Sequence, residues 1–355
     1  MTEFGKRETL IMKGVGGILL LIHHLFGESN LPYYTVLSGN IGGRALLFFS
    51  HGCKICVALF IILSGFGLTK SYNKKHGNNS ATSSFKESIL FSLNHIKKLL
   101  FQYWWAVIPL AAFGVISGMR PLSDVYGTEF GWFFRLFTDV LGINYLLYGL
   151  NYLFNITCWY MSVALLTYFL FPFLNQILQK NRITFCAVII ASIALPKFLP
   201  INGLKWIVYF EIGMLLAYTG ALDLAVKSVN GKKALTDIGI TIAFVFSAIL
   251  YYYNHDLFGG LFAVSIIVFV LMAYNRLRFI GKPLAFVGKH SANIFMMHTF
   301  FYHYYFREVI YFLKYPVLVL ATLLAVCLAY SAILQSFKML FSKFIYKIRK
   351  GKTFA

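Results

Sequence analysis

The chain has 355 residues, of which 59% are hydrophobic and only 12% charged, and its mean hydropathy is +0.71. A soluble fold of this composition would leave too much apolar surface exposed to water, so the composition excludes an ordinary soluble enzyme. We expect an all-α, polytopic membrane protein, and we expect the net charge of +20 to reflect topology and not nucleic-acid binding.

Apolar runs long enough to cross a bilayer recur along the whole chain. A transmembrane helix needs about 20 predominantly apolar residues. About ten such helices are expected, beginning near Leu10, Ala45, Leu99, Ile156, Ile183, Leu204, Ile238, Leu257, Ala292 and Val317. If the N-terminus is cytoplasmic, 24 of the 32 Lys and Arg residues fall on the cytoplasmic side and 8 at or toward the outside. The positive-inside rule therefore predicts ten spans with both termini in the cytoplasm.

The polar joints between the spans divide one domain, 1–355, into recognisable parts. Residues 70–98 are predicted to form a cytoplasmic loop whose first half is flexible and whose second half is amphipathic toward the third span, and residues 338–355 a basic cytoplasmic tail. Residues 118–155 mix aromatic and charged side chains, and we expect an outer interfacial helix and loop that covers a site. Cys53 and Cys56 form a CxxC pair, which we interpret as helix packing, so no metal site is expected.

The first span, which begins KGVGGILLLIHHLF, carries two histidines in an otherwise apolar helix. Eleven residues separate Lys13 from His24, which puts both side chains on one helix face about 16 Å apart along the axis. His23 points about 100° away. Ionisable groups within a span usually face an interior or an aqueous cavity and mark function. Two interpretations stay open: an anionic, extended ligand reaching from Lys13 to His24, or a basic topology anchor with histidines that only pack.

Two further ionisable groups are predicted at a similar depth in the membrane. His298 lies about 13 Å beyond Lys289 on a helix that runs in the same direction as the first. Glu211 lies within the apolar run IVYFEIGMLLAY and could orient a histidine or pair structurally with a lysine such as Lys54. These residues suit either acyl chemistry or a proton relay, so a proton-coupled transporter is the alternative function.

Three stretches together resemble the acyltransferase-3 family of integral-membrane acyltransferases. KGVGGILLLIHHLF is similar to the first-helix motif of a basic residue followed by a histidine. KICVALFIILSGFGL, 54–68, and CWYMSVALLTYFLFPFL, 158–174, resemble the second and fourth motif helices. YFEIGMLLA, 209–217, and GKHSANIFMMHTF, 288–300, follow in the family's order, so the resemblance covers essentially the whole chain.

The resemblance implies a multi-pass O-acetyltransferase of the bacterial cytoplasmic membrane, similar to polysaccharide and capsule O-acetyltransferases. It implies acetyl-coenzyme A as co-substrate, no tightly bound cofactor, and a polysaccharide or lipid-linked glycan as acceptor. The implied catalytic residues are His24, His298 and Glu211, supported by His23 and Ser64, and the implied coenzyme A ligands are Lys13, Lys97 and Lys98.

Some positions depart from the family's pattern. Lys13 replaces the more usual arginine, which keeps the charge but loses the fork-shaped geometry on phosphate. Val163, Ala164 and Leu165 stand where many members carry a glutamate, so no carboxylate role is expected there.

Overall fold

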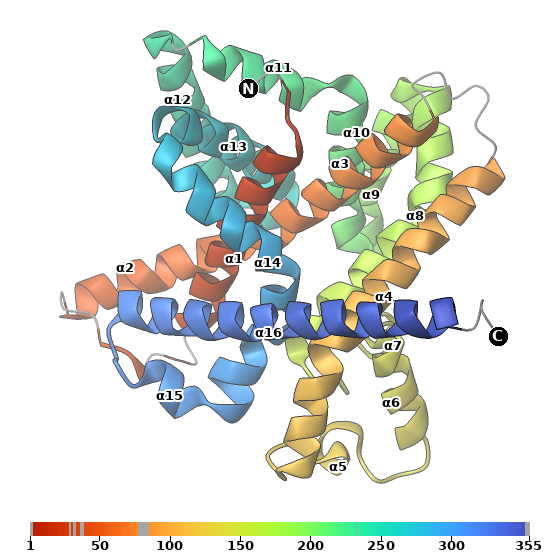
Figure 1. Cartoon of the computed structure of the whole chain (residues 1–355). Helices are drawn as coiled ribbons and strands as arrows, with labels where there is room; N and C mark the ends of the chain where they lie inside the picture. Colours follow the sequence, from red (N-terminus) through yellow and green to blue (C-terminus); the bar gives the residue numbers. More distant parts are fainter. Residues whose placement is uncertain are drawn as a thin grey trace.

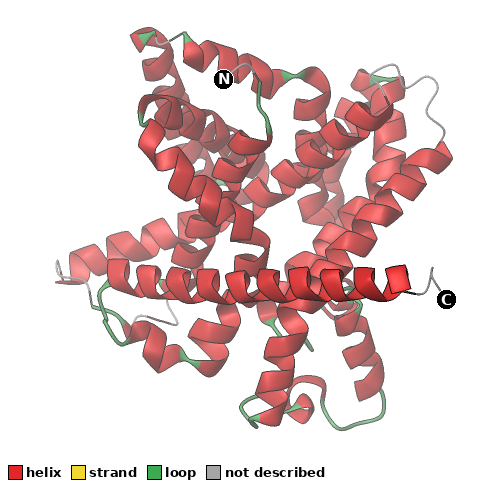
Figure 2. Ribbon diagram, viewed as in Figure 1, coloured by secondary structure: helices red, strands yellow, loops and turns green. Residues whose placement is uncertain are grey.

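The protein is built from helices that cross, tilt and pack without any sheet. The computed structural model describes residues 3–27, 30, 33–35, 39–76, 85–231 and 233–351, with side chains at all of these except 39–41 and 344–351. Every regular element in these ranges is helical (Figure 2). The prediction of an all-α fold is confirmed.

The first half of the chain supplies the central helix and three long partners. In chain order the elements are α1 (Lys6–Leu25), α2 (Gly39–Gly52), η2 (Cys53–Ile55), α3 (Cys56–His76), α4 (Phe85–Ile116), α5 (Leu122–Tyr126), α6 (Trp132–Val140), α7 (Asn144–Tyr148), η3 (Ile156–Cys158) and α8 (Trp159–Lys180).

The second half adds the helices that complete the bundle. They are α9 (Arg182–Phe198), η4 (Leu204–Trp206), α10 (Ile207–Thr219), α11 (Ala221–Asn230), α12 (Ala234–Tyr253), α13 (His255–Arg276), η5 (Arg278–Ile280), α14 (Gly281–Thr299), η6 (Phe300–Tyr305), α15 (Arg307–Tyr311) and α16 (Pro316–Gly351). The element η6 is a turn of π-helix that continues α14.

Many of these helices have the length and composition of membrane spans. Within the described ranges seven segments are long and apolar enough to cross a membrane, and the pair α10–α11, bent by 66°, would make an eighth. The two other predicted spans correspond to α9, which has only 17 residues, and to α14, which is less apolar. A multi-pass membrane protein is confirmed, while the number of ten spans stays a prediction.

Two helix pairs approach so closely that their backbones touch through glycine. A Cβ at Gly14 of α1 would lie 2.0 Å from the Leu284 carbonyl oxygen of α14, and one at Gly288 of α14 would lie 1.8 Å from the Leu10 oxygen. The pair α3 and α10 uses Gly65 in the same manner, 2.2 Å from the Phe210 oxygen. Small residues allow this approach in membrane helices, where van der Waals contact drives association.

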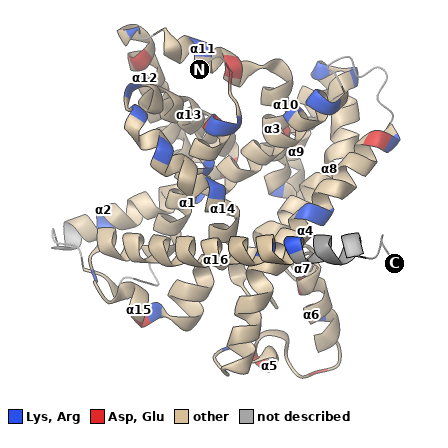
Figure 3. Ribbon diagram, viewed as in Figure 1, with Lys and Arg blue, Asp and Glu red and all other residues tan. Residues whose placement is uncertain are grey.

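The two ends of the molecule differ in their charge. The N-terminus and α11 lie at one end, while α5, α6, α7 and α15 lie at the other (Figure 1). Lysine and arginine gather toward the α11 end, and the α5–α7 end carries few of them (Figure 3). This distribution agrees with the predicted topology, in which residues 118–155 face outward.

The predicted cytoplasmic loop 70–98 is shorter than expected. Residues 70–76, within the half predicted to be flexible, are the last turns of α3, and residues 85–98, which include the part predicted to be amphipathic, are the first turns of α4. The basic residues of these turns lie on helix surfaces, where long charged side chains keep their ends in water while their stems cover apolar surface. Residues 77–84 of the loop and 352–355 of the predicted tail lie outside the described residues.

The outer segment 118–155 contains the expected helix and loop, with three short helices in place of one. Its centre is Asp139 on α6, a carboxylate that is only 3% exposed. The Tyr126 hydroxyl donates to its Oδ2 at 2.6 Å and the Phe154 amide at 2.8 Å. Burial raises the pKa of Asp139 from 3.8 to about 6 despite these two donors.

Asp139 should therefore make the stability of this outer segment pH-dependent. Because its pKa is higher in the folded state than in the unfolded state, its stabilising contribution is complete below pH 3.8 and is lost as the pH rises through about 6. The full shift corresponds to about 3 kcal/mol in the free energy of unfolding, of which about 1 kcal/mol is regained when the pH falls from 7 to 5.

The measurement is the denaturation midpoint of the purified protein at pH 7 and pH 5. The increase in the denaturation midpoint from pH 7 to pH 5 should be larger for wild-type protein than for Asp139→Asn. The amide oxygen of asparagine still accepts both hydrogen bonds but does not titrate. Asp124→Asn, an exposed carboxylate on α5, should behave like wild type. Equal gains in wild type and Asp139→Asn would contradict this account.

Candidate functional site

The predicted histidines meet at the outward end of the α1–α14 pair. The rings of His24 and His298 lie 4.9 Å apart between centroids, and the His23 ring lies 4.9 Å from His24. The contact follows from the helix pairing, because each histidine stands ten residues beyond the glycine at which the two backbones touch. His298 is completely buried, whereas His24 keeps part of its surface exposed. The prediction of equal depth is confirmed, and the two rings are also neighbours laterally.

The backbone fixes the tautomer of His298. Its Nδ1 lies 2.9 Å from the Ile294 oxygen and 3.0 Å from the Phe295 oxygen. Two carbonyl oxygens can only accept, so Nδ1 carries the proton and Nε2 presents its lone pair. Oγ1 of Thr299 lies 3.4 Å from Nε2, within hydrogen-bond distance. In its neutral form the His298 ring therefore has its proton on Nδ1, and Nε2 can accept from the Thr299 hydroxyl.

Tyr302 on η6 completes the cluster. Its ring stacks on His298 with centroids 6.0 Å apart and planes 14° apart, and it lies 6.3 Å from the His24 ring. Single turns of π-helix often occur at functional sites because the wider turn redirects the side chains. The η6 turn brings Tyr302, four residues after His298, against both rings.

His23 connects the cluster to a cavity of about 440 Å³. His23 Nδ1 lies 2.9 Å from the Ser50 carbonyl oxygen, which can only accept a hydrogen bond, so Nδ1 carries the proton. The cavity is lined by the outward ends of helices, with residues from α1, α2, η2, α3, η4, α10, α12 and α13: His23, His51, Lys54, Ile55, Ala58, Lys205, Trp206, Tyr209, Tyr251, His255 and Asp256.

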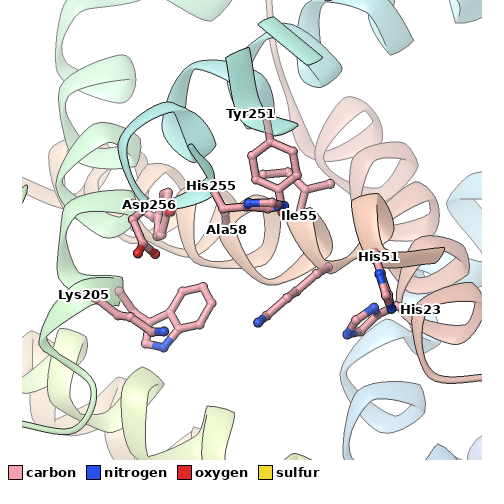
Figure 4. Close-up of a pocket in the computed structure, with 11 residues that line it drawn as sticks. His23, His51, Ile55, Ala58, Lys205, Tyr251, His255 and Asp256 are labelled. Atoms are coloured by element: carbon pink, nitrogen blue, oxygen red, sulfur yellow. The ribbon is translucent and has the colours of Figure 1, made fainter. Parts of the chain in front are cut away.

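The cavity combines aromatic rings with charged groups. Lys205 and Asp256 lie on one side, opposite His23 and His51, and Tyr251 lies above the space between them (Figure 4). The Lys205 ammonium lies over the Trp206 ring, 5.4 Å from the ring centroid. Ligand sites typically present apolar and aromatic walls with a few placed polar groups, and this cavity has that composition.

The lysines that were predicted to bind coenzyme A differ in their surroundings. Lys13 is half-buried on α1, about 16 Å from His24 toward the N-terminal end. Lys97 and Lys98 are exposed on α4. Close to them on α4, Gln102 accepts a hydrogen bond from Lys338 of α16. No contact joins Lys13 to the α4 pair within the described residues.

Ser64 and Glu211 lie apart from the histidines. The Ser64 hydroxyl is 3.0 Å from the Tyr168 hydroxyl of α8, which ties two family motif helices together. Glu211 is 1% exposed and accepts from the Ser192 hydroxyl of α9 at 2.9 Å, while its Oε2 has no hydrogen-bond partner within the described residues. Glu211 thus pairs with a serine, and neither of the expected partners, a histidine or Lys54, contacts it.

Sequence reasoning missed Tyr302 and all of the cavity wall beyond His23. Most of the wall residues are polar or aromatic side chains, and some of them, for example Lys205 and Asp256, stand at the outward ends of predicted spans. That shared position was a usable signal. Which of these helix ends adjoin one another depends on lateral packing, which a single sequence does not specify.

A comparison with protein-family models identifies an acyltransferase domain over residues 11–334. No curated protein and no solved structure matches the chain. The matched region runs from α1 to α16 and includes His24, His298 and the motif helices α3 and α8. The chain therefore belongs to the acyltransferase-3 family of integral-membrane acyltransferases.

Proposed function

We propose that this protein transfers an acetyl group from cytoplasmic acetyl-coenzyme A to a hydroxyl of a cell-surface or lipid-linked glycan, in a bacterial cytoplasmic membrane. The observation that carries the proposal is the His24–His298 pair, which adjoins an outward cavity through His23 while Lys13 stands on the same helix toward the cytoplasm. One site thus borders both compartments.

The donor approaches along α1. Lys13 meets the anionic part of coenzyme A as a point charge, and exposed Lys97 and Lys98 add to the positive field at the cytoplasmic surface. The arm that carries the thioester extends along the helix toward His24, over about 16 Å. Half-burial of Lys13 strengthens its attraction for a negative charge relative to an exposed lysine.

The acceptor hydroxyl reacts at the histidine pair. A neutral imidazole takes the hydroxyl proton as the oxygen attacks the thioester carbonyl; the C–S bond then breaks, and coenzyme A leaves as the thiol with the proton that the imidazolium returns. General base catalysis of this kind contributes about 10²- to 10⁴-fold. His24 is the base because its ring is partly exposed, while His298, whose ring is fixed by hydrogen bonds to the backbone, packs against it. Tyr302 has the position to orient the reacting groups through its hydroxyl.

The cavity suits a sugar better than an apolar substrate. Trp206, Tyr209 and Tyr251 offer flat faces for a sugar ring, and Lys205 and Asp256 offer hydrogen bonds to its hydroxyls. This supports a glycan acceptor on the outer side.

The test uses purified protein in vesicles, with labelled acetyl-coenzyme A on the cytoplasmic face and glycan on the other. The expected result is label in the glycan, which gains the mass of an acetyl ester. The alternative, a proton-coupled transporter, predicts movement of a substrate without any acylated product. Absence of acylated glycan over a panel of acceptors would overturn the proposal.

Loss of the Lys13 charge should chiefly weaken donor binding. Lys13→Ala should raise the KM for acetyl-coenzyme A by about tenfold or more, because a charge-assisted contact contributes about 1.5 to 3 kcal/mol. The acceptor KM should change little. Lys13→Arg is the matched variant and should keep most of the donor affinity, since the charge is retained. An unchanged donor KM in Lys13→Ala would make this residue a topology anchor only.

A further inference from the structure

An apolar groove of about 380 Å³ runs along the bundle from its outward end to just past the middle of α13. It lies between α1, α2, α12 and α13, and its walls include Leu19, Phe48, Ala248 and Val270. Along α12 the lining extends from Phe244 to Tyr252, about 12 Å of helix. The groove therefore runs along the helices, in the direction of a hydrocarbon chain in the membrane.

The groove ends where the polar cavity begins. Ile55 lines both spaces, and Lys54 of the cavity stands between Cys53 and Ile55 of the groove. The α2–α12 side is closed by Tyr252, whose hydroxyl donates to the Phe48 oxygen at 2.8 Å and whose ring stacks on Phe48. An apolar channel thus leads to a cationic group and then to the cavity beside the histidines.

We propose that the groove holds the hydrocarbon chain of a lipid-linked acceptor, a saccharide joined through phosphate to a single isoprenoid chain. This inference rests on the proposed acetyl transfer to a glycan and narrows its acceptor class. The chain lies along α12 and α13, the phosphate meets Lys54 where the groove ends, and the sugar occupies the cavity next to His23, whose ring contacts His24.

The size and the charge of the two spaces favour this occupant. A volume of about 380 Å³ is near the lower end for ligand sites and accommodates a segment of one chain, not two side by side. An exposed lysine ammonium at the polar end is a strong partner for phosphate. Among the cavity-lining side chains, two lysines, Lys54 and Lys205, stand against the single carboxylate of Asp256, so the cavity attracts an anion.

The experiment compares three acceptors that carry the same saccharide. The first is linked to one isoprenoid chain through phosphate, the second to a two-chain glycerolipid, and the third is the free saccharide. Wild-type protein should show a KM for the isoprenoid acceptor at least tenfold below that for the two-chain acceptor. Because both lipids concentrate in the membrane, partition alone does not produce this difference.

Filling the groove should remove the preference. Ala248→Trp should raise the KM for the isoprenoid acceptor at least tenfold and leave kcat/KM for the free saccharide unchanged. Val270→Trp fills the same groove from α13 and should act alike, which covers the case in which the first variant does not fold. The matched control is Ile249→Trp, because Ile249 is the next residue on α12, is 62% exposed and does not line the groove. It should behave like wild type.

Several outcomes would overturn the inference. Equal KM values for the one-chain and two-chain acceptors would show that the groove holds only bulk lipid. An unchanged isoprenoid KM in both tryptophan variants would have the same meaning. If the tryptophan variants lose transfer activity equally toward the free saccharide and toward the lipid-linked one, the groove has a structural role only. Failure of the proposed function is distinct from these results, since no acceptor, including the free saccharide, would then be acetylated.

Discussion

Replacing His24 with alanine is expected to reduce acetyl transfer by about 10³-fold while leaving the folded protein in the membrane. The magnitude is that of a lost general base. Folding should survive because the His24 side chain makes no hydrogen bond within the described residues and is partly exposed, so its removal leaves no buried donor or acceptor unsatisfied. The measurement is the single-turnover rate with labelled acetyl-coenzyme A and glycan.

A matched pair of histidines separates chemistry from packing. His298 and His95 each place Nδ1 2.9 Å from the carbonyl oxygen four residues earlier, but only His298 faces His24. His298→Ala should lower transfer by about 10²-fold, and His95→Ala should leave it unchanged. Wild-type rates in His24→Ala would refute a catalytic role for that residue.

The same reagents distinguish the two chemical roles of His24. Without an acceptor, a general base leaves the enzyme unlabelled, whereas an acyl-carrying nucleophile accumulates one labelled acetyl group per site. The partly exposed ring of His24, which an acceptor hydroxyl can reach, favours the base. Label on wild-type protein that is absent from His24→Ala would assign the nucleophilic role instead.

Adding one methyl group at the α1–α14 crossing is expected to damage both stability and catalysis. In Gly288→Ala the new Cβ would meet the Leu10 oxygen at 1.8 Å, and a main-chain atom cannot rotate away as a side chain can. The helices must separate, which costs about 1 to 3 kcal/mol or more. A displacement of about 1 Å between His24 and His298 should also lower transfer by about a hundredfold.

Gly17→Ala provides the matched control in the same interface. The nearest atom to its new Cβ is a Val287 methyl group at 3.7 Å, an ordinary contact distance. Alanine is also the better helix former, by about 1 kcal/mol. The denaturation midpoint and the transfer rate of Gly17→Ala should therefore match or exceed those of wild type, while both fall in Gly288→Ala. Equal behaviour of the two variants would show that this crossing does not set the site geometry.

Much of the architecture could be predicted because it depends on local patterns. Apolar runs and the distribution of lysine and arginine indicate helices and their direction, and the helix rise then gives the depth of His24 and His298. Residues 70–76 were predicted to be part of a flexible loop because polar sequence was equated with irregular structure. In fact α3 and α4 extend beyond their apolar cores as helices with polar surfaces.

The lateral arrangement could not be predicted from this sequence. The position of Glu211 beside Ser192, and of Tyr302 beside both histidines, depends on which helix faces adjoin. Glycines at close crossings decide that packing, but nothing in the sequence around Gly14 and Gly288 indicates that these two crossings are the same one. The cavity has the same origin, since its wall is collected from eight separate elements.

The histidine pair and the cavity belong to different parts of the bundle. The histidines stand on α1 and α14, whose spacing is set by main-chain contact, whereas most of the cavity and groove wall comes from α2, η2, η4, α10, α12 and α13. If the cavity holds the acceptor as proposed, such a division makes specificity exchangeable. Grafting the outward ends of those elements from a relative would then redirect the enzyme to another acceptor without rebuilding its chemistry.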